Sequence, residues 1–106
     1  MPQFVIQQTE SNKWFYEFLS EDKSILLTGT KHEIKQACLG EIVSVKMNAE
    51  YEENFEIRKT PGNDYFFILR SMGNHQIIGI SEMYSNKETC EKIISQTRKY
   101  IEKIKK

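Results

Sequence analysis

The sequence predicts an α+β domain made by tandem duplication of a β-β-β-α unit. The two units are expected to form one antiparallel sheet, with two helices packed on one face and a pseudo-twofold axis between the halves. Three observations support this: the halves repeat, each half carries three short strand patterns, and each half ends in a helical stripe. We expect a single domain over residues 1–106. Repeat one spans 3–48, repeat two spans 55–106, and 49–54 is a linker or an exchanged strand.

The repeat is visible as a constant offset between matching residues. The first pairs lie 51 residues apart (55 − 4): Phe4-Val5-Ile6 with Phe55-Glu56-Ile57, Trp14 with Tyr65, and Leu26-Leu27 with Ile77-Ile78. Later pairs lie 52 apart (90 − 38): Lys35 with Lys87, Cys38 with Cys90, and Ile42 with Ile94. Matches of aromatic with aromatic and turn with turn over this length indicate duplication.

Each half then predicts three strands rich in aromatic and β-branched residues. They are Phe4 to Gln8, Trp14 to Leu19, Ser24 to Thr28, and in the second half Phe55 to Lys59, Tyr65 to Ser71, Gln76 to Ile80. Turn residues separate them, as in Glu10-Ser11-Asn12 and in Pro61-Gly62-Asn63-Asp64. Gly73-Asn74 favours a tight hairpin.

An amphipathic helix is expected at the end of each half, because apolar residues recur there at steps of three and four. The first stripe is Ile34, Ala37, Cys38, Ile42 and Val45, and the second is Cys90, Ile93, Ile94, Thr97, Ile101 and Ile104. Thr30 with Glu33, and Ser85 with Glu88, have the spacing of a capping box, which predicts that the helices begin there.

Three segments carry a family resemblance: Phe55 to Thr60, Ile42 to Lys46, and the run from Asn74 to Gly79 followed by Ser81, Met83 and Tyr84. Together they resemble the YegP-like proteins. The resemblance implies paired β-β-β-α-β units that exchange the strand after each helix, here Met47 to Glu53. After the second helix only Tyr100 to Lys106 remains, which is typical of further helix. The family is largely bacterial and has no assigned biochemical function, so the resemblance implies no catalytic residues.

Composition restricts the function classes. Fifteen basic residues balance fifteen acidic ones, which argues against binding nucleic acid by bulk electrostatics. No stretch is apolar for long enough to span a membrane, and the N-terminus has no secretory signal pattern. The two cysteines, Cys38 and Cys90, are therefore expected to be reduced thiols in the cytoplasm, buried on the sheet-facing sides of their helices.

Six residues are candidates for interaction: Asn74, His75, Gln76, Phe15, Phe66 and Tyr84. The polar trio falls in a predicted hairpin tip, where a binding role competes with ordinary turn chemistry, which we favour. Consecutive aromatics place rings on both sheet faces, so Phe15 and Phe66 or their neighbours are expected on the face away from the helices. That face would be a protein interface or a stacking surface for bases. His32 and His75 have no partners at the spacing of a zinc site.

The sequence therefore predicts a small non-enzymatic binding or assembly module, with no catalytic, metal or cofactor site. Its partner would be an unidentified protein or another copy of the chain, with no membrane involved. The alternative is binding of nucleic acid or a small ligand through the aromatic sheet and the basic C-terminal helix. That helix carries seven Lys or Arg against three Glu over residues 87–106. An acidic segment, Glu50 to Glu56, makes nucleic acid the weaker expectation.

Overall fold

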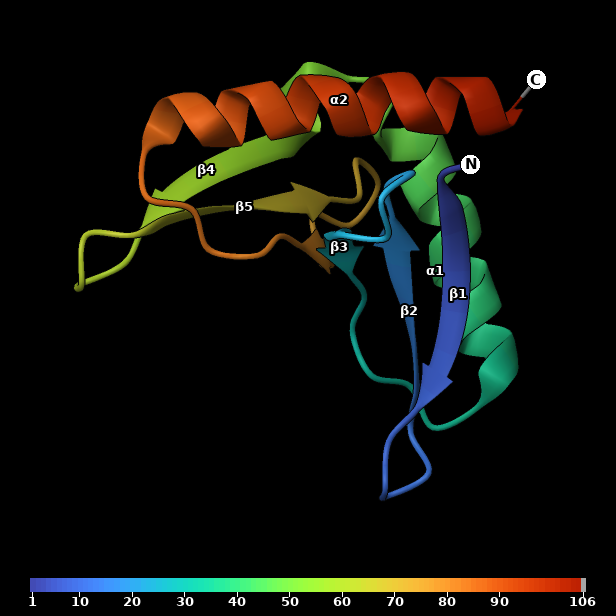
Figure 1. The fold of residues 1–106 in the computed structure, drawn as a ribbon. Coiled ribbons are helices and arrows are strands. Elements are labelled where there is room, and N and C mark those ends of the chain that lie inside the picture. Colours follow the sequence, from blue (N-terminus) through green and yellow to red (C-terminus); the bar gives the residue numbers. More distant parts are fainter. Residues whose placement is uncertain (106) are drawn as a thin grey trace.

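The computed structural model describes residues 1–105, which form six strands, two α-helices and a single 3₁₀ turn (Figure 1). The expected α+β architecture is confirmed. The elements are β1 (Gln3–Gln8), β2 (Trp14–Leu19), β3 (Ile25–Thr28), α1 (Lys35–Asn48), η1 (Glu52–Asn54), β4 (Phe55–Lys59), β5 (Tyr65–Arg70), β6 (Ile77–Ile80) and α2 (Lys87–Lys105).

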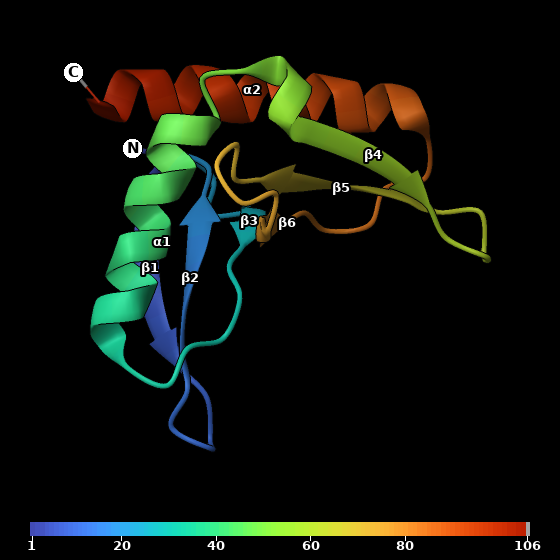
Figure 2. The same ribbon diagram turned by 180° about the vertical axis from the view of Figure 1, so that it is seen from behind.

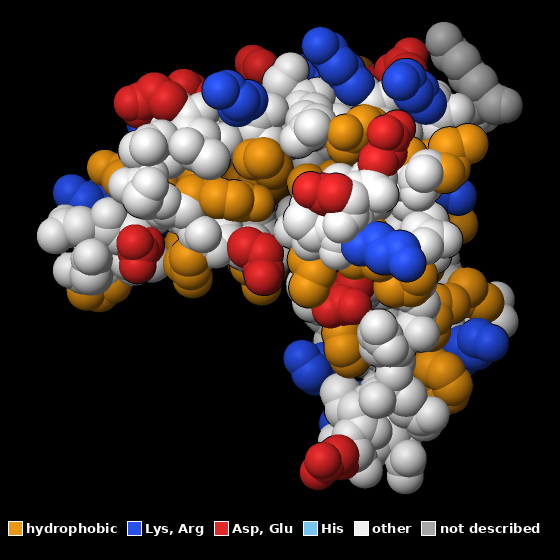
Figure 3. Space-filling view, viewed as in Figure 1, with side chains coloured by type: hydrophobic (Ala, Val, Ile, Leu, Met, Phe, Trp, Pro, Cys, Tyr) orange, Lys and Arg blue, Asp and Glu red, His pale blue; other side chains and the backbone are white. Residues whose placement is uncertain are grey.

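All six strands belong to one antiparallel sheet with the order β1-β2-β3-β6-β5-β4. The centre of the sheet is the junction of β3 and β6, where one residue pair, Thr28 with Ile80, is in register. The two halves of the sheet are steeply inclined to each other, with α1 and α2 on the outer side of the bend (Figures 1 and 2). The opposite face of the sheet lines a hollow between the half formed by β1, β2 and β3 and the half formed by β4, β5 and β6 (Figure 3).

Successive side chains along each strand point to opposite faces of the sheet, so each strand contributes residues to both faces. Tyr16 and Phe18 of β2, and Phe67 and Leu69 of β5, are fully buried in one core together with both helices. From the helices, the core receives Cys38, Ile42 and Val45 of α1, and Cys90, Ile94 and Ile101 of α2. The second helical stripe is thus confirmed. In the first stripe, Ala37 and Ile34 are exposed, and Ile34 precedes the helix.

Four non-glycine residues adopt positive φ, all in turns: Asn12, Lys23, Asn63 and His75. No glycine does so, although Gly73-Asn74 was the expected site of the tight turn. In that loop, His75 takes the left-handed conformation instead, with φ of 60°. Its N–H bonds the carbonyl of Ser71 at 2.8 Å, which closes a wider turn than a two-residue hairpin.

Both predicted capping boxes are wrong. The Thr30 hydroxyl does not cap α1 but donates to the Glu41 carboxylate at 2.6 Å, and Ile34 occupies the cap position without a side-chain bond. At α2, the carboxamide oxygen of Asn86 accepts from the N–H of Thr89 at 2.8 Å. An Asx cap one residue after Ser85 thus serves that helix.

The strand expected at Met47 to Glu53 does not form. Met47 belongs to α1, and Glu52 begins η1. Segment 49–54 therefore connects α1 to β4 without joining the sheet. The C-terminal residues continue α2 as far as Lys105, as their pattern indicates, and the expected helix at Lys106 lies outside the described residues.

Candidate interaction surfaces

The polar trio of the β5–β6 loop is explained by turn chemistry. The carboxamide oxygen of Asn74 accepts the Gln76 N–H at 3.1 Å, and Arg70 donates to the His75 carbonyl at 2.7 Å. Asn74, His75 and Gln76 are all exposed. These bonds stabilise the loop, and a binding role for the trio stays a prediction.

The two aromatic candidates lie on the open sheet face but do not meet. Phe15 pairs with Gln7, and Phe66 pairs with Arg58, so β3 and β6 separate their strands. Both rings are half-buried, and neither packs against the core. Tyr84 lies on the opposite side, where it packs against the core and exchanges two 2.7 Å backbone bonds with Tyr65. The sequence candidates thus form no single site.

Charges on the open face are mixed and mutually paired. Glu56 contacts Arg58 at 2.8 Å and Arg70 at 3.3 Å, and these two guanidinium groups lower the pKa of that carboxyl. Lys31 places its ammonium 5.1 Å from the centre of the Phe15 ring. Figure 3 shows the hollow from the side, with hydrophobic side chains along its edge interrupted by acidic and basic ones. Among the described residues of this face, the two arginines are thus paired with a carboxylate.

The cysteines are buried free thiols on the core sides of their helices. Burial raises the pKa of both thiols, and the nearby carboxylate of Glu41 raises that of Cys38 further. A raised pKa disfavours the thiolate that a nucleophile requires. Both residues therefore act as core side chains.

Sequence reasoning missed a polar cluster around Glu41, a buried residue of α1. Its carboxylate accepts two bonds from Thr30, from the N–H at 3.0 Å and from the hydroxyl at 2.6 Å, and lies 3.3 Å from Nε2 of His32. The buried ring of Tyr16 lies next to Glu41, and the pKa of its hydroxyl is raised well above its ordinary value, first by burial and then by that charge. These donors satisfy the carboxylate, so the cluster anchors the β3–α1 connection.

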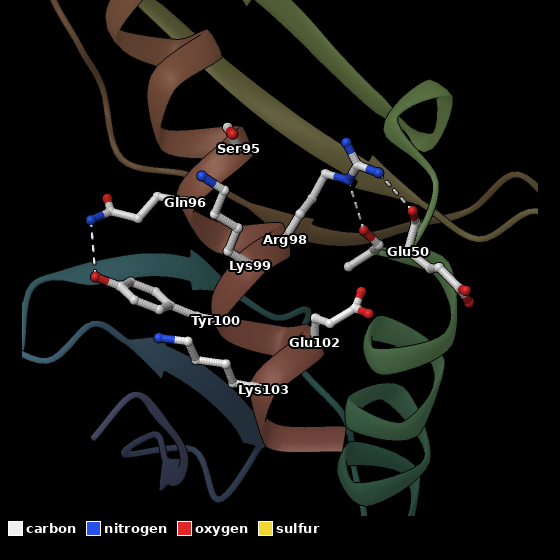
Figure 4. A pocket seen from close by; sticks show the side chains of 9 residues that line it. Glu50, Ser95, Gln96, Arg98, Lys99, Tyr100, Glu102 and Lys103 are labelled. Atoms are coloured by element: carbon white, nitrogen blue, oxygen red, sulfur yellow. Dashed lines mark hydrogen bonds between the residues drawn. The ribbon is translucent and has the colours of Figure 1, made fainter. Parts of the chain in front are cut away.

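Charged residues of α2 line a shallow depression of about 670 Å³ beside the end of α1 (Figure 4). Its central side chain, Arg98, points toward the other helix and donates to the carbonyls of Ala49 at 3.3 Å and Glu50 at 2.8 Å. These carbonyls follow the last turn of α1, where a cation is favourable. Part of the basic C-terminal helix thus has a structural role.

The outer face of α1 carries the most apolar exposed surface of the helices. Leu39, Val43 and Met47 are 37%, 56% and 63% exposed, and they follow each other at steps of four residues. Met72 of the β5–β6 loop and Tyr51 add two further exposed apolar side chains beside them. All of these residues except Leu39 line, together with Gly40 and Ser44, a groove of about 630 Å³. We call this surface the α1 outer face: Leu39, Gly40, Val43, Ser44, Met47, Tyr51 and Met72.

The stripe of the α1 outer face is present in the sequence, but it was missed because a second apolar stripe on the same helix supplies the core. A helix that is apolar all round is typical of a buried environment.

Within residues 1–105, no helix is long and apolar enough to cross a membrane, and no three His, Cys, Asp or Glu side chains group to hold a metal ion.

This chain is similar to known proteins in both sequence and structure. The sequence profile of a family described as "Domain of unknown function (DUF1508)" matches residues 62–103. A UPF0339 protein of Photorhabdus laumondii is 30% identical over 90% of this chain and 82% of its own length. The solution structure of YegP from Escherichia coli is similar with a TM-score of 0.85 and 26% identity, covering 92% of this chain and 83% of that one. A UPF0339 protein of Shewanella oneidensis has a similar fold, with a TM-score of 0.86 and 21% identity over 92% of this chain and 82% of that one.

Proposed function

Because this chain belongs to the YegP-like UPF0339 family, which is described by a domain of unknown function, we propose its role from its own surfaces. We propose that it is a non-enzymatic module that associates with protein through the α1 outer face. The observation that carries the proposal is the second apolar stripe of α1, with Val43 and Met47 more than half exposed.

The solvent-facing side of α1 is apolar. A helix that packs with one face normally presents polar residues on the other. In α1 the positions opposite the core are Gly40, Val43 and Met47, and Met72 extends the same apolar surface from a different element. Contiguous exposed apolar surface rimmed by polar groups is typical of a protein interaction site.

The test is capture of protein from lysate, with and without nuclease treatment, supplemented with untagged copies of the same chain. Tagged wild-type protein should retain a protein, and Val43→Lys should lose it because a charge enters the apolar patch. Met83→Lys is the matched control, since Met83 is also 56% exposed but does not line the groove. Capture that survives Val43→Lys, or that disappears with nuclease, would contradict the proposal.

A second candidate function, binding of single-stranded nucleic acid, is supported by the half-buried rings of Phe15 and Phe66 on the open sheet face. Stacking on each ring can contribute about 1–3 kcal/mol per base. The pairing of Arg58 and Arg70 with Glu56 weakens this candidate. Fluorescence anisotropy with labelled oligonucleotides at physiological salt decides it. Submicromolar binding lost in a folded Phe66→Ala variant would favour this candidate over the first.

We also infer that the two halves are copies of one ancestral unit related by a pseudo-twofold axis. Support comes from backbone details that recur. Positive φ occurs at Asn12 and Asn63, 51 apart, and at Lys23 and His75, 52 apart. The isolated bridges Trp14–His32 and Tyr65–Tyr84 follow the same pattern.

The register of the strands corrects one part of the sequence alignment. Thr28 pairs with Glu17, and Ile80 pairs with Ile68, so Thr28 corresponds to Ile80 at an offset of 52. Leu26-Leu27 therefore matches Ile78-Gly79, one residue later than the sequence match suggested. The additional residue of the second half lies in the β5–β6 loop, where hairpins accept insertions. An ancestral single unit, produced alone, should assemble as a twofold dimer in size-exclusion chromatography if the inference is right, and remain unfolded or monomeric if it is wrong.

A further inference from the structure

We propose that the partner of the α1 outer face is a second copy of this chain, with the two α1 helices antiparallel about a twofold axis. This inference rests on the proposed function and names its partner. In the proposed pair, Val43 of one copy packs over Gly40 of the other. Because the axis repeats every contact, two such contacts form at the centre of the interface.

The first observation behind this pairing is that Gly40 is an exposed glycine with open space around it. It lies in the middle of α1, where glycine destabilises a helix relative to alanine. A Cβ added to Gly40 would meet no atom within 4 Å, and the residue is exposed. Nothing within the described chain therefore requires a glycine there. A close approach by an external backbone or side chain supplies the missing reason.

The spacing of the stripe makes the α1 outer face complementary to itself. Four exposed positions of α1 follow each other at steps of four, three and four residues, and this spacing is the same in both directions along the helix. They are Gln36, Gly40, Val43 and Met47. This is the seam spacing of paired helices. In an antiparallel pair, Val43 faces Gly40 and Met47 faces Gln36, so a large side chain meets a smaller or flexible one at every level. A heterologous partner would have no need of this symmetry.

Charge at the two ends of α1 favours the same orientation. Lys31 and Lys35 lie at its N-terminal end beside Glu33, and Glu50, Glu52 and Glu53 follow its C-terminal end, after Lys46 in the last turn. The N-terminal end thus carries a small basic excess, and the segment after the C-terminal end is acidic. Antiparallel pairing brings the basic end of each copy to the acidic end of the other. Glu50 and Glu52 already pair with Lys105 and Arg98, but their side chains remain 51% and 82% exposed, so they are accessible to a second cation.

Sedimentation velocity over a range of concentrations, up to millimolar, tests the inference. Wild-type protein should show a concentration-dependent dimer. Gly40→Leu should raise the dimer dissociation constant at least tenfold, because the new side chain fills the space that Val43 of the other copy occupies. Val43→Lys should have the same effect, and Met83→Lys should have none.

Gly40→Leu also separates association from folding. Leucine is a better helix former than glycine, and the site is open, so the thermal midpoint of the diluted, monomeric variant should rise. Loss of the dimer together with a raised midpoint cannot come from unfolding. A wild-type chain that stays monomeric, or a dimer that Gly40→Leu leaves intact, would overturn the inference. If the chain is monomeric but still captures another protein in a Val43-dependent way, only this inference fails and the proposed function stands.

Discussion

The contact between Tyr16 and the β6 strand offers a double-mutant test of the junction between the two halves. Tyr16 is fully buried, and its hydroxyl donates to the Ile78 carbonyl at 2.7 Å. Gly79 lies directly beside this hydroxyl, since a Cβ added there would sit 2.7 Å from the Tyr16 oxygen and 3.2 Å from Cδ2 of Leu27. The two residues should therefore be strongly coupled in stability.

Each single change should destabilise the fold for a different reason. Tyr16→Phe removes a buried donor from the Ile78 carbonyl, which costs about 1–3 kcal/mol. Gly79→Ala forces a methyl group against the hydroxyl, and overpacking of this kind costs about 1–3 kcal/mol. The backbone of Gly79 does not have positive φ, so alanine brings no conformational strain of its own.

The double variant should lose less than the sum of the two single losses. Once the hydroxyl is gone, the nearest atoms to the new methyl are those of Leu27, whose side chain can shift by a few tenths of an ångström. We expect a coupling of about 1–2 kcal/mol in the favourable direction. Equilibrium unfolding in urea, followed by circular dichroism, measures all four free energies. The pair Tyr16→Phe with Gly73→Ala is the control, since a Cβ at Gly73 would contact nothing within 4 Å. Additivity of Tyr16→Phe and Gly79→Ala within about 0.5 kcal/mol would refute the reasoning.

Further predictions concern three other places in the fold. The buried hydroxyl of Thr97 has no hydrogen-bond partner among the described residues, so Thr97→Val should raise the free energy of unfolding by about 1 kcal/mol, and an unchanged or lower value in urea unfolding would contradict this. Asp22 accepts bonds from two serine hydroxyls and a backbone N–H, which lower its pKa to about 2. Because the folded pKa lies below the ordinary value, the charged carboxylate stabilises the fold above about pH 4 and this contribution is lost as the pH falls towards 2. An NMR titration should find this pKa raised in Ser20→Ala, and no change on that substitution would exclude the proposed cause. Cys38 and Cys90 should react with a bulky thiol reagent far more slowly in the native state than in urea, whereas rapid native labelling would show that they are accessible.

The positions of the strands and of α2 follow from local patterns, and the start of α1 does not. The strand bounds depend on alternation and turn residues, which act over a few residues. The Thr30–Glu33 pattern predicted a cap because it has the right local spacing. The structure gives Thr30 a different partner, Glu41, eleven residues later (41 − 30). A buried carboxylate competes better for that hydroxyl than a helix N–H does, and this competition depends on tertiary packing.

The surface that we propose as functional was visible but ambiguous. Periodicity finds apolar stripes, and α1 has two of them, with Val45 on one and Val43 on the other. No local rule decides which stripe the sheet covers, because that depends on the direction in which the chain leaves β3. Conversely, Asn74 and His75 were reasonable candidates as exposed loop residues, and only their bonds to Gln76 and Arg70 reveal a turn-forming role.

The short junction between β3 and β6 has a consequence for cooperativity. One residue pair in register, Thr28 with Ile80, joins the two halves of the sheet, so few backbone bonds cross it. Other bonds between the halves involve side chains. The Tyr16 hydroxyl donates to the Ile78 carbonyl, and Arg98 donates to the Glu50 carbonyl. The Asn48 side chain accepts the N–H of Met72 at 2.8 Å. In native-state hydrogen exchange, amides of β3 and β6 should then be protected through packing of the helices more than through the ladder. Weakening one such side-chain bond should let each half open as a separate exchange unit before the whole chain unfolds.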